Sequence, residues 1–428
     1  MAYNITTTFN TTDPNTNTTQ DLGSRYLTKN YLLDVYPNIA SGSGNRTAPG
    51  LWAWGDNRTY TLGLNNAGYY SSPVQVGSLT NWKSITLSGS CAVAIKTDGT
   101  MWSWGWNGSN GGLLGQNVGS STIYYSSPVQ IGALTTWKQV TAGPIKFHAI
   151  KTDGTLWAWG DNTRGALGVG NIVSYYSSPV QVGALTTWRN IAQNTTNVGG
   201  DFSLAIKTDG TLWGWGDNRY GELGINTVST LYYSNPIQVG ALTNWKQASV
   251  GGVSTLTGYF SAAVKTDGTL WSWGSNIIGQ LGNGQISATT YYSSPIQVGA
   301  LTNWKQVSIG SYTGYAIKTD GTLWVWGYNH SLYGVLGLGT NSATLYYSSP
   351  VQVGALTNWK SVYTAGIGVM AIKTDGTLWG WGKNDNGQLG IGTTGTYYSS
   401  PVQIGALTTW KSIYSFGGST LAIQDGYI

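Results

Sequence analysis

The chain has little of the chemistry on which most proteins rely. Its 428 residues include one Cys, two His and a single Glu, and charged residues make up 9%, against roughly 25% in an ordinary soluble domain. Cys91 therefore has no internal disulfide partner, and its apolar neighbours predict a buried strand. No apolar run reaches the roughly 20 residues that a membrane-spanning helix needs.

Against this background, one pattern dominates the chain. The motif Trp-x-Trp-Gly recurs at intervals of 50 to 58 residues, and a fixed period of this length predicts an array or a propeller. The seven copies begin at Trp52, Trp102, Trp157, Trp213, Trp271, Trp324 and Trp379. A residue that recurs in every copy is first of all a structural part.

Each repeat predicts about four short strands and no helix. The segment Lys-Thr-Asp-Gly-Thr followed by Leu-Trp-Ala-Trp indicates a hairpin, because Asp-Gly supplies the positive φ of a tight turn. Trp157 and Trp159 are two residues apart and share one strand face, and the small residue between them should lie against the adjacent blade. A loop Asn-x-x-Gly-x-Leu-Gly follows, whose Leu we expect in the core. Tyr-Tyr-Ser-Ser-Pro then indicates a loop that leads into an edge strand.

These motifs resemble the repeats of the regulator of chromosome condensation family. The resemblance rests on Trp-x-Trp-Gly, Asn-x-x-Gly-x-Leu-Gly, the downstream Pro and the Asp-Gly hairpin, and it covers about residues 51–426. It implies an all-β, seven-bladed β-propeller. The chain departs from the family in the Gly-x-x-His that usually precedes the hairpin, which only His148 approximates.

The two chain ends predict how the ring closes. There are seven Trp-x-Trp-Gly copies but only six Lys-Thr-Asp-Gly-Thr hairpins, and the first copy has no hairpin arm before it. The sequence Leu-Ala-Ile-Gln-Asp-Gly near the C-terminus supplies the missing arm. We therefore expect the last strand to pair with the first, which removes open sheet edges, in a propeller of residues 49–428.

Residues 1–48 lie outside the array and form what we call the N-terminal arm. Its first 20 residues are mostly Thr and Asn, too polar for a core, so we expect a mostly extended arm and linker. A short apolar segment follows, with candidate partner-docking residues Tyr26, Leu27, Tyr31, Leu32, Leu33 and Tyr36. It either docks on a partner or folds back onto a propeller face.

Doubled tyrosines precede each Pro, and the first of each pair is a candidate contact on one rim of the disc. Exposed aromatic side chains stack on sugars or anchor protein interfaces, but at least one Tyr of each pair is expected to pack beneath its loop. The candidate rim contacts are Tyr69, Tyr124, Tyr175, Tyr232, Tyr291, Tyr346 and Tyr397.

The scarce ionisable groups argue against catalysis and against nucleic acid. His148 and His330 stand in different repeats, too few for a zinc site, and no Asp departs visibly from the repeat to form a glycosidase pair. No Gly-rich phosphate loop leads into a helix. Of the 21 Lys and Arg, 13 occupy repeat positions, so we interpret the net charge of +5 as dispersed. We expect no enzyme, cofactor or metal.

Three functions remain open. The first is a virion structural protein of a tailed bacteriophage, in capsid decoration, a neck or tail appendage or host adhesion, because similar repeats occur in phage and bacterial proteins. Its arm would dock on other virion proteins, and its propeller would meet host glycans or proteins; a homo-oligomer is possible. The alternatives are a cytoplasmic scaffold or guanine-nucleotide-exchange regulator, and a carbohydrate-binding lectin. The first residues lack the features of a secretory signal peptide, so we expect location in a virion or in the cytoplasm.

Overall fold

A computed structural model describes residues 10–12, 19–21, 50–109, 111–194, 201–253, 257–286, 291–329, 333–340 and 346–425. The chain divides into two compact units, Met1–Ala48 with Gly426–Ile428 and Pro49–Asp425. In the first unit, β1 (Asn10–Thr12) pairs antiparallel with β2 (Thr19–Asp21). Within these ranges no helix is long and apolar enough to cross a membrane.

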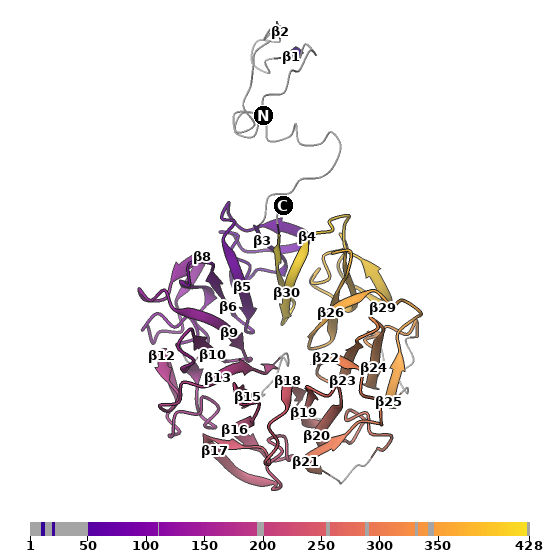
Figure 1. Cartoon of the computed structure of the whole chain (residues 1–428). Coiled ribbons are helices and arrows are strands. Elements are labelled where there is room, and N and C mark those ends of the chain that lie inside the picture. Colours follow the sequence, from indigo (N-terminus) through magenta and orange to yellow (C-terminus); the bar gives the residue numbers. More distant parts are fainter. Residues whose placement is uncertain are drawn as a thin grey trace. The chain divides into compact units, whose positions relative to one another are not determined.

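The second unit is a seven-bladed β-propeller, as predicted (Figure 1). Each blade is an antiparallel sheet whose strands follow one another in space as they do in the chain. The closing blade is β30 (Trp410–Phe416), β31 (Ser419–Gln424), β3 (Gly50–Asp56) and β4 (Tyr69–Gln75). The next is β5 (Trp82–Leu87), β6 (Cys91–Lys96), β7 (Met101–Trp106) and β8 (Tyr124–Gln130). It is followed by β9 (Trp137–Ala142), β10 (Lys146–Lys151), β11 (Leu156–Asp161) and β12 (Tyr175–Gln181).

The remaining four blades repeat this plan. The first has β13 (Trp188–Ile191), β15 (Phe202–Lys207), β16 (Leu212–Asn218) and β17 (Ser229–Gln238). The second has β18 (Trp245–Val253), β19 (Gly258–Lys265), β20 (Leu270–Ser275) and β21 (Tyr291–Gln297), with β14 (Gln193–Asn194) added in parallel to β18. The third has β22 (Trp304–Ile309), β23 (Thr313–Lys318), β24 (Leu323–Tyr328) and β25 (Tyr346–Gln352). The fourth has β26 (Trp359–Ala365), β27 (Gly368–Lys373), β28 (Leu378–Asn384) and β29 (Thr396–Gln403).

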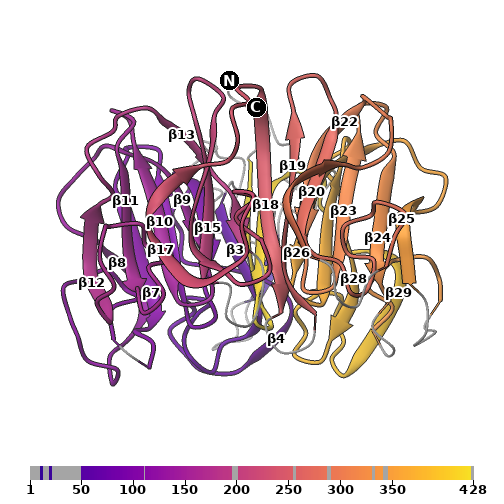
Figure 2. The same ribbon diagram turned by 90° about the horizontal axis from the view of Figure 1, so that it is seen from below.

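The first strand of each blade is innermost and the fourth is outermost. Strands β5, β9, β22, β26 and β30 lie near the centre of the ring in Figure 1, and β12, β21, β25 and β29 lie at its perimeter. Figure 2 shows the same strands from the side, running between the two faces of the disc. The part of the chain described here contains strands and turns but no helix, in agreement with the predicted all-β class.

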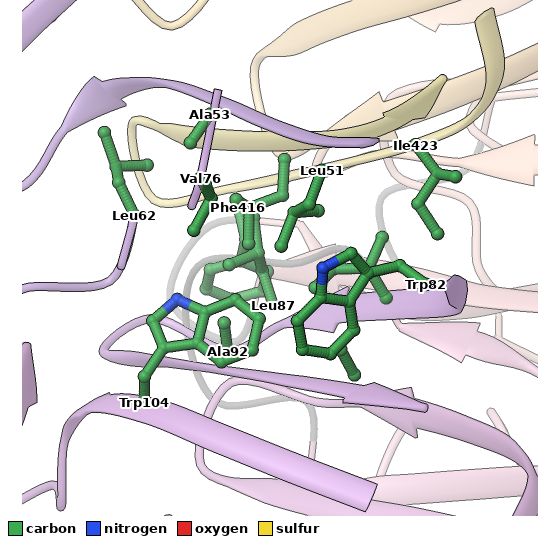
Figure 3. Packing of buried hydrophobic residues seen from close by; sticks show 13 residues of the cluster. Leu51, Ala53, Leu62, Val76, Trp82, Leu87, Ala92, Trp104, Phe416 and Ile423 are labelled. Atoms are coloured by element: carbon green, nitrogen blue, oxygen red, sulfur yellow. The ribbon is translucent and has the colours of Figure 1, made fainter. Parts of the chain in front are cut away.

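The closing blade combines both ends of the propeller. β3 pairs antiparallel with β31, with Leu51 opposite Ile423 and Trp54 opposite Thr420. The prediction that the last strand completes the first blade is therefore confirmed. Figure 3 shows the resulting core, in which Leu51 and Ile423 from this blade face Trp82 and Trp104 of the next one.

The core lies in the seams between blades, and tryptophan explains why. The second Trp of each Trp-x-Trp-Gly is fully buried and donates its indole N–H to a loop carbonyl of the preceding blade. For example, Trp159 donates to Leu113 at 3.0 Å. All seven seams contain this bond, at 2.9 to 3.0 Å. The small residue between the Trps packs toward the next blade, as Ala158 does beside Trp188 and Trp215.

A second bond repeats in every seam. A loop N–H of one blade donates to the carbonyl of a Ser in the Tyr-Tyr-Ser stretch of the next, as Gly170 donates to Ser234 at 2.8 Å. The same bond joins the last loop to the closing blade, where Gly392 donates to Ser71 at 2.7 Å. The seam that joins the chain ends therefore has the same hydrogen bonds as the others.

Candidate functional site

The propeller has two different faces, which we name by what they carry. Because the strands are antiparallel, the turn between the second and third strands and the start of the first strand lie at one end of each sheet. We call this end the hairpin face; Thr97 N–H donates there to Asn81 O at 2.8 Å. The opposite end carries the Asn-x-x-Gly-x-Leu-Gly loops and the start of each outer strand. We call it the tyrosine face.

The seven candidate rim tyrosines, which we call the tyrosine rim, lie at equivalent points of the tyrosine face. The expectation that they sit in loops is wrong: each lies at or near the start of an outer strand, and Tyr175 pairs with Asp161. The Pro that follows is compatible with an outermost strand, where one edge needs no N–H donor. Six of the seven are 38 to 50% exposed, and Tyr232 is half-buried.

The second tyrosine of each pair has a structural role, as expected. Tyr125 is half-buried between two core clusters, and Tyr176 and Tyr292 bridge clusters in the same way. Several of these hydroxyls bond to their own loops, as Tyr176 does with Asn171 at 3.2 Å. In most pairs, therefore, the first tyrosine is exposed on the rim and the second packs into the core.

Six of the rim tyrosines contact a further ring or a cation, and the partner differs from blade to blade. Tyr124 stacks on Trp106, with ring centroids 6.2 Å apart, and Tyr346 stacks on Tyr328 at 4.9 Å. The other contacts are Tyr69 with Arg58, Tyr232 with Arg164, Tyr291 with Tyr220 and Tyr397 with Tyr333. A constant aromatic ring thus sits beside a variable partner on each contacted blade.

The loops that supply these variable partners have a rigid base. Asn162 is fully buried, accepts from Leu167 N–H at 3.1 Å and donates to Asn171 O at 3.0 Å. Gly165 has φ +67°, and a Cβ there would lie 2.9 Å from the Cα of Ser234 on the next blade. Only glycine allows that approach. The Asn and the Gly of the motif therefore fix the loop, while the residues between them are free to vary.

At one place on the tyrosine face, ionisable residues break the sevenfold pattern. Arg164 lies 2.8 Å from Asp201 and 3.4 Å from Asp217, and Arg219 binds both carboxylate oxygens of Asp217. Lys146 is buried and donates to Phe202 O at 3.1 Å. We call these residues, with Asp161, the charge cluster. It spans the blades that begin with β9 and β13.

Burial shifts the ionisation of this region. Desolvation lowers the pKa of Lys146 to about 8, although Asp201, Asp161 and Asp217 oppose the shift. Desolvation also raises the pKa of Asp201 against the opposing effect of Lys146 and Arg164. His148 is buried with its ring 5.4 Å from that of Trp215, and desolvation lowers its pKa to about 3. His148 is therefore neutral at physiological pH.

Glu222, the single glutamate, takes a place that glutamine takes elsewhere. It is fully buried, and Tyr220 N–H donates to its Oε2 at 2.7 Å. Gln280 and Gln388 stand at the same loop position and accept the same bond from Ile278 and Asn386, at 2.8 and 2.9 Å. Desolvation, followed by the charge of Asp217, raises the pKa of Glu222 to about 8. A protonated carboxyl is the nearest analogue of the glutamine amide.

The ionisable groups of the propeller are mostly buried or paired, and the exposed groups of the tyrosine face include aromatic rings. In the described part of the chain, no group of three His, Cys, Asp or Glu is placed to hold a metal ion. Cys91 is fully buried, as predicted, and burial raises the pKa of its thiol to about 12. The carboxylates of Asp201 and Asp217 are paired with arginine, whereas six of the rim tyrosines are exposed.

Sequence reasoning found the rim but missed the charge cluster. The expectation that no Asp stands apart from its repeat is wrong, because Asp201 and Asp217 both bind Arg164 of the neighbouring blade, whereas the equivalent Asp56 binds only Arg58 of its own loop. The signal was present: Lys146, Arg164, Asp201, Arg219 and Glu222 are among the charges that the repeat does not supply, and they lie within 77 residues of one another in the chain. The proposed docking residues Tyr26, Leu27, Tyr31, Leu32, Leu33 and Tyr36, and also His330, lie outside the described residues.

Comparison with known proteins identifies the repeat. The family described as Regulator of chromosome condensation (RCC1) repeat matches residues 50–95, 153–206, 267–317 and 375–423. A second RCC1 repeat family matches residues 196–222 and 304–332.

Relatives cover most of the propeller. Ultraviolet-B receptor UVR8 of Arabidopsis thaliana is 29% identical over 79% of this chain and 74% of its own length. The mitochondrial RCC1 domain-containing protein RUG3 of the same plant is 28% identical over 92% of this chain and 90% of its own. Prp20p of Saccharomyces cerevisiae, studied for its binding to Gsp1p and histones, superposes with a TM-score of 0.74 at 19% identity, covering 89% and 92% of the two chains.

These relatives bear on the open functions. All three are cellular proteins, of a plant and a yeast. They support RCC1 repeats but give no support to the phage or bacterial type, to a virion location or to a role in a virus particle. The alternative of a scaffold or regulator is the better supported one.

Proposed function

We propose that this RCC1-repeat protein is a non-catalytic scaffold or regulator that binds another protein through its tyrosine face. The observation that carries the proposal is the tyrosine rim, in which constant exposed rings stand beside partners that vary from blade to blade. Tyrosine supplies a large, rigid contact area at a low entropic cost and is enriched at the energetic centres of protein interfaces.

The charge cluster makes one part of the proposed surface different from the rest. A ring of seven equal tyrosines would present seven equal sites, but the face differs where Arg164 and Arg219 bind Asp217. The two arginine side chains keep 32% of their surface exposed. A partner that binds across Tyr175, Tyr232 and this cluster can therefore recognise one blade position among seven.

The relatives support the same class of function. Prp20p is a protein studied for binding to other proteins, Gsp1p and histones, and its fold is the one found here. A propeller of this size offers a rigid face of the kind on which standard interfaces of about 800 Å² per partner form.

The test removes rim tyrosines and leaves the fold intact. Proximity cross-linking from source cells would use the wild-type chain and the variant Tyr175→Ser/Tyr291→Ser, whose two changed side chains flank the charge cluster and are each 38% exposed. A partner identified with the wild type is then purified and titrated against both proteins. We expect the double variant to bind at least about tenfold more weakly, since interface anchors contribute more than about 1.4 kcal/mol.

The matched control lies on the opposite face. Leu134→Ser/Leu356→Ser changes two side chains of 47% and 45% exposure on the hairpin face and should leave the affinity unchanged. Equal loss in both double variants, or none in either, would contradict the proposal. Binding of glycans but of no protein would instead establish the lectin alternative. If the partner is a small GTPase, a nucleotide-release assay separates exchange from scaffolding.

We also propose that the N-terminal arm, residues 1–48, is a second docking element. Its support is the clustering of Tyr26, Tyr31 and Tyr36 among leucines in a chain that otherwise repeats. Deleting residues 1–48 should leave the propeller's melting temperature unchanged and remove one cross-linked partner. A large fall in melting temperature would show that the arm packs on the propeller instead.

A further inference from the structure

Seven cations occupy the same position on the innermost strands. Each directly follows the Trp that begins its strand and lies on a β-bulge. In β5, for example, Trp82 pairs with Lys96 and Ser84 pairs with Ile95, so that Lys83 between them has no partner residue in the ladder. The bulge recurs in all seven blades. The members of this cationic ring are Lys83, Lys138, Arg189, Lys246, Lys305, Lys360 and Lys411.

Six of the seven members of the ring form no ion pair with a described residue. Arg189 donates to Trp245 O at 2.8 Å, and Lys411 lies 3.0 Å from Asp425. The other five are exposed lysines, and none takes part in an ion pair among the described residues. The interpretation that the repeat disperses these charges is wrong, because closing the ring gathers equivalent positions around one axis.

The net charge of the propeller belongs to one face. The hairpin face carries thirteen Lys and Arg against seven Asp, whereas the tyrosine face carries five Lys and Arg against five Asp and Glu222. A one-sided distribution of this kind steers oppositely charged partners. The partner of the hairpin face should therefore be acidic.

The distances of these charges from the propeller axis indicate what kind of acidic partner fits the hairpin face. The cationic ring is on the innermost strands, but the Asp residues lie on the hairpins between the second and third strands, farther from the axis. A flat anionic membrane would meet both rings at once. A narrow acidic segment placed on the axis would meet the lysines and avoid the aspartates.

Exposed leucines on the same face indicate that the partner is also partly apolar. Each loop that crosses from an outer strand to the next inner strand carries one Leu. Six of them are 45 to 47% exposed, namely Leu79, Leu134, Leu185, Leu242, Leu301 and Leu356. Interfaces with nucleic acid are strongly polar, whereas a polypeptide can combine carboxylates with apolar side chains.

We propose that the hairpin face binds an acidic polypeptide segment that also carries apolar side chains, with its carboxylates on the cationic ring and its apolar groups against the leucines. This inference goes beyond the proposed function, because it concerns the opposite face and a second kind of partner. The two faces would then hold two partners on one rigid disc.

The experiment titrates the full-length protein with a fluorescent peptide of twelve alternating Glu and Leu residues. The variant Lys83→Gln/Lys305→Gln removes two unpaired ring charges. We expect about tenfold weaker binding, as two exposed charge pairs would give, and a steep loss of wild-type affinity as salt rises past 0.1 M. The control Arg58→Gln/Lys383→Gln removes the same net charge from the tyrosine face and should bind as the wild type does.

Two further measurements separate the contribution of the leucines to peptide binding from that of the cationic ring. Leu79→Ser/Leu301→Ser should weaken binding of the Glu-Leu peptide but not of a twelve-residue all-Glu peptide, and Tyr175→Ser/Tyr291→Ser should change neither. Equal weakening by the two charge-removal variants would overturn the proposal as non-specific attraction. Tighter binding of a 12-base-pair duplex or of phosphatidylserine vesicles than of the peptide would also overturn it. Because the tyrosine variant is tested in parallel, failure of the function proposed for the tyrosine face remains distinguishable from failure of the proposal for the hairpin face.

Discussion

Six blades are continuous in sequence, and the closing blade is assembled from the two ends of the chain. The seam bonds are the same in both: Trp54 donates to Gln388 O at 2.9 Å, as Trp215 donates to Ala166 O. The hairpins differ. Six hairpins hold a lysine between two tryptophans, whereas the closing blade places Gln424 there. Ring closure therefore reproduces the contacts between blades but not those within the hairpin.

The lysine position shows what the closing blade lacks. In the six ordinary hairpins the ammonium lies 3.4 to 3.7 Å from the first Trp ring and 4.8 to 5.1 Å from a second. The first Trp also donates to a hairpin Thr, as Trp324 does to Thr322 at 2.8 Å. In the closing blade, Gly50 stands where that Thr would be, and the buried Trp52 N–H has no hydrogen-bond partner among the described residues.

The largest expected effect comes from removing the strand that joins the ends. Deleting residues 420–428 removes nearly all of β31, which pairs with both β30 and β3, so two strand edges and the apolar core around Ile423 are exposed. We expect a loss of several kcal/mol of stability and aggregation, checked by thermal melting and size-exclusion chromatography. Deleting only residues 426–428 is the control. Unchanged melting of the longer deletion would contradict closure by this strand.

Equivalent substitutions in two seams test whether the seam at the chain ends is as stable as a seam between continuous blades. Trp54→Phe and Trp215→Phe each remove a buried indole N–H bond and leave a cavity in the seam, while the loop carbonyl keeps one donor, Thr420 Oγ1 or Ser203 Oγ. We expect each to cost about 3 kcal/mol, measured by chemical denaturation. The two losses should agree within about 1 kcal/mol. A much smaller loss for Trp54→Phe would mean that the seam at the chain ends is open in solution.

The repeat explains why so much of the fold could be predicted from sequence and so little of the site. Seven copies of Trp-x-Trp-Gly and a missing hairpin at Trp52 determine blade number and closure, because each implies a periodic or pairwise contact. The rim tyrosines were found for the same reason. The charge cluster was missed because Arg164 is 37 residues from Asp201 and 53 from Asp217 in the chain and meets them only across a seam. The cationic ring was misjudged because closure brings together what the sequence separates.

Glu222 provides the next comparison, between a glutamate and two glutamines at one loop position. Its folded pKa of about 8 lies above the ordinary value of 4.5, so its contribution to stability is greatest below pH 4.5 and is lost as pH rises toward 8. Glu222→Gln should therefore be more stable than the wild type at pH 9, by at least about 2 kcal/mol. The difference should shrink as pH falls to 4.

Melting curves of both proteins from pH 4 to 9 check this prediction. The control is Gln388→Glu, which places the carboxyl in a loop that lacks a neighbour equivalent to Asp217. It should introduce a pH-dependent loss of the same sign. A Glu222→Gln effect that does not vary with pH would show that the carboxyl stays ionised in the folded protein.

The smallest effect is expected from a substitution that makes the closing blade resemble the other six. Gln424 donates to Thr409 Oγ1 at 2.6 Å, and the rings of Trp52 and Trp410 lie 6.2 Å apart in the same edge-to-face arrangement as Trp304 and Trp324. Gln424→Lys should place an ammonium between them and stabilise the propeller by about 0.5 to 1 kcal/mol, less the lost hydrogen bond. The reverse change, Lys318→Gln, should destabilise an ordinary hairpin by a similar amount. If both substitutions destabilise, the closing blade is adapted to glutamine, and its difference from the other six is a feature of closure itself.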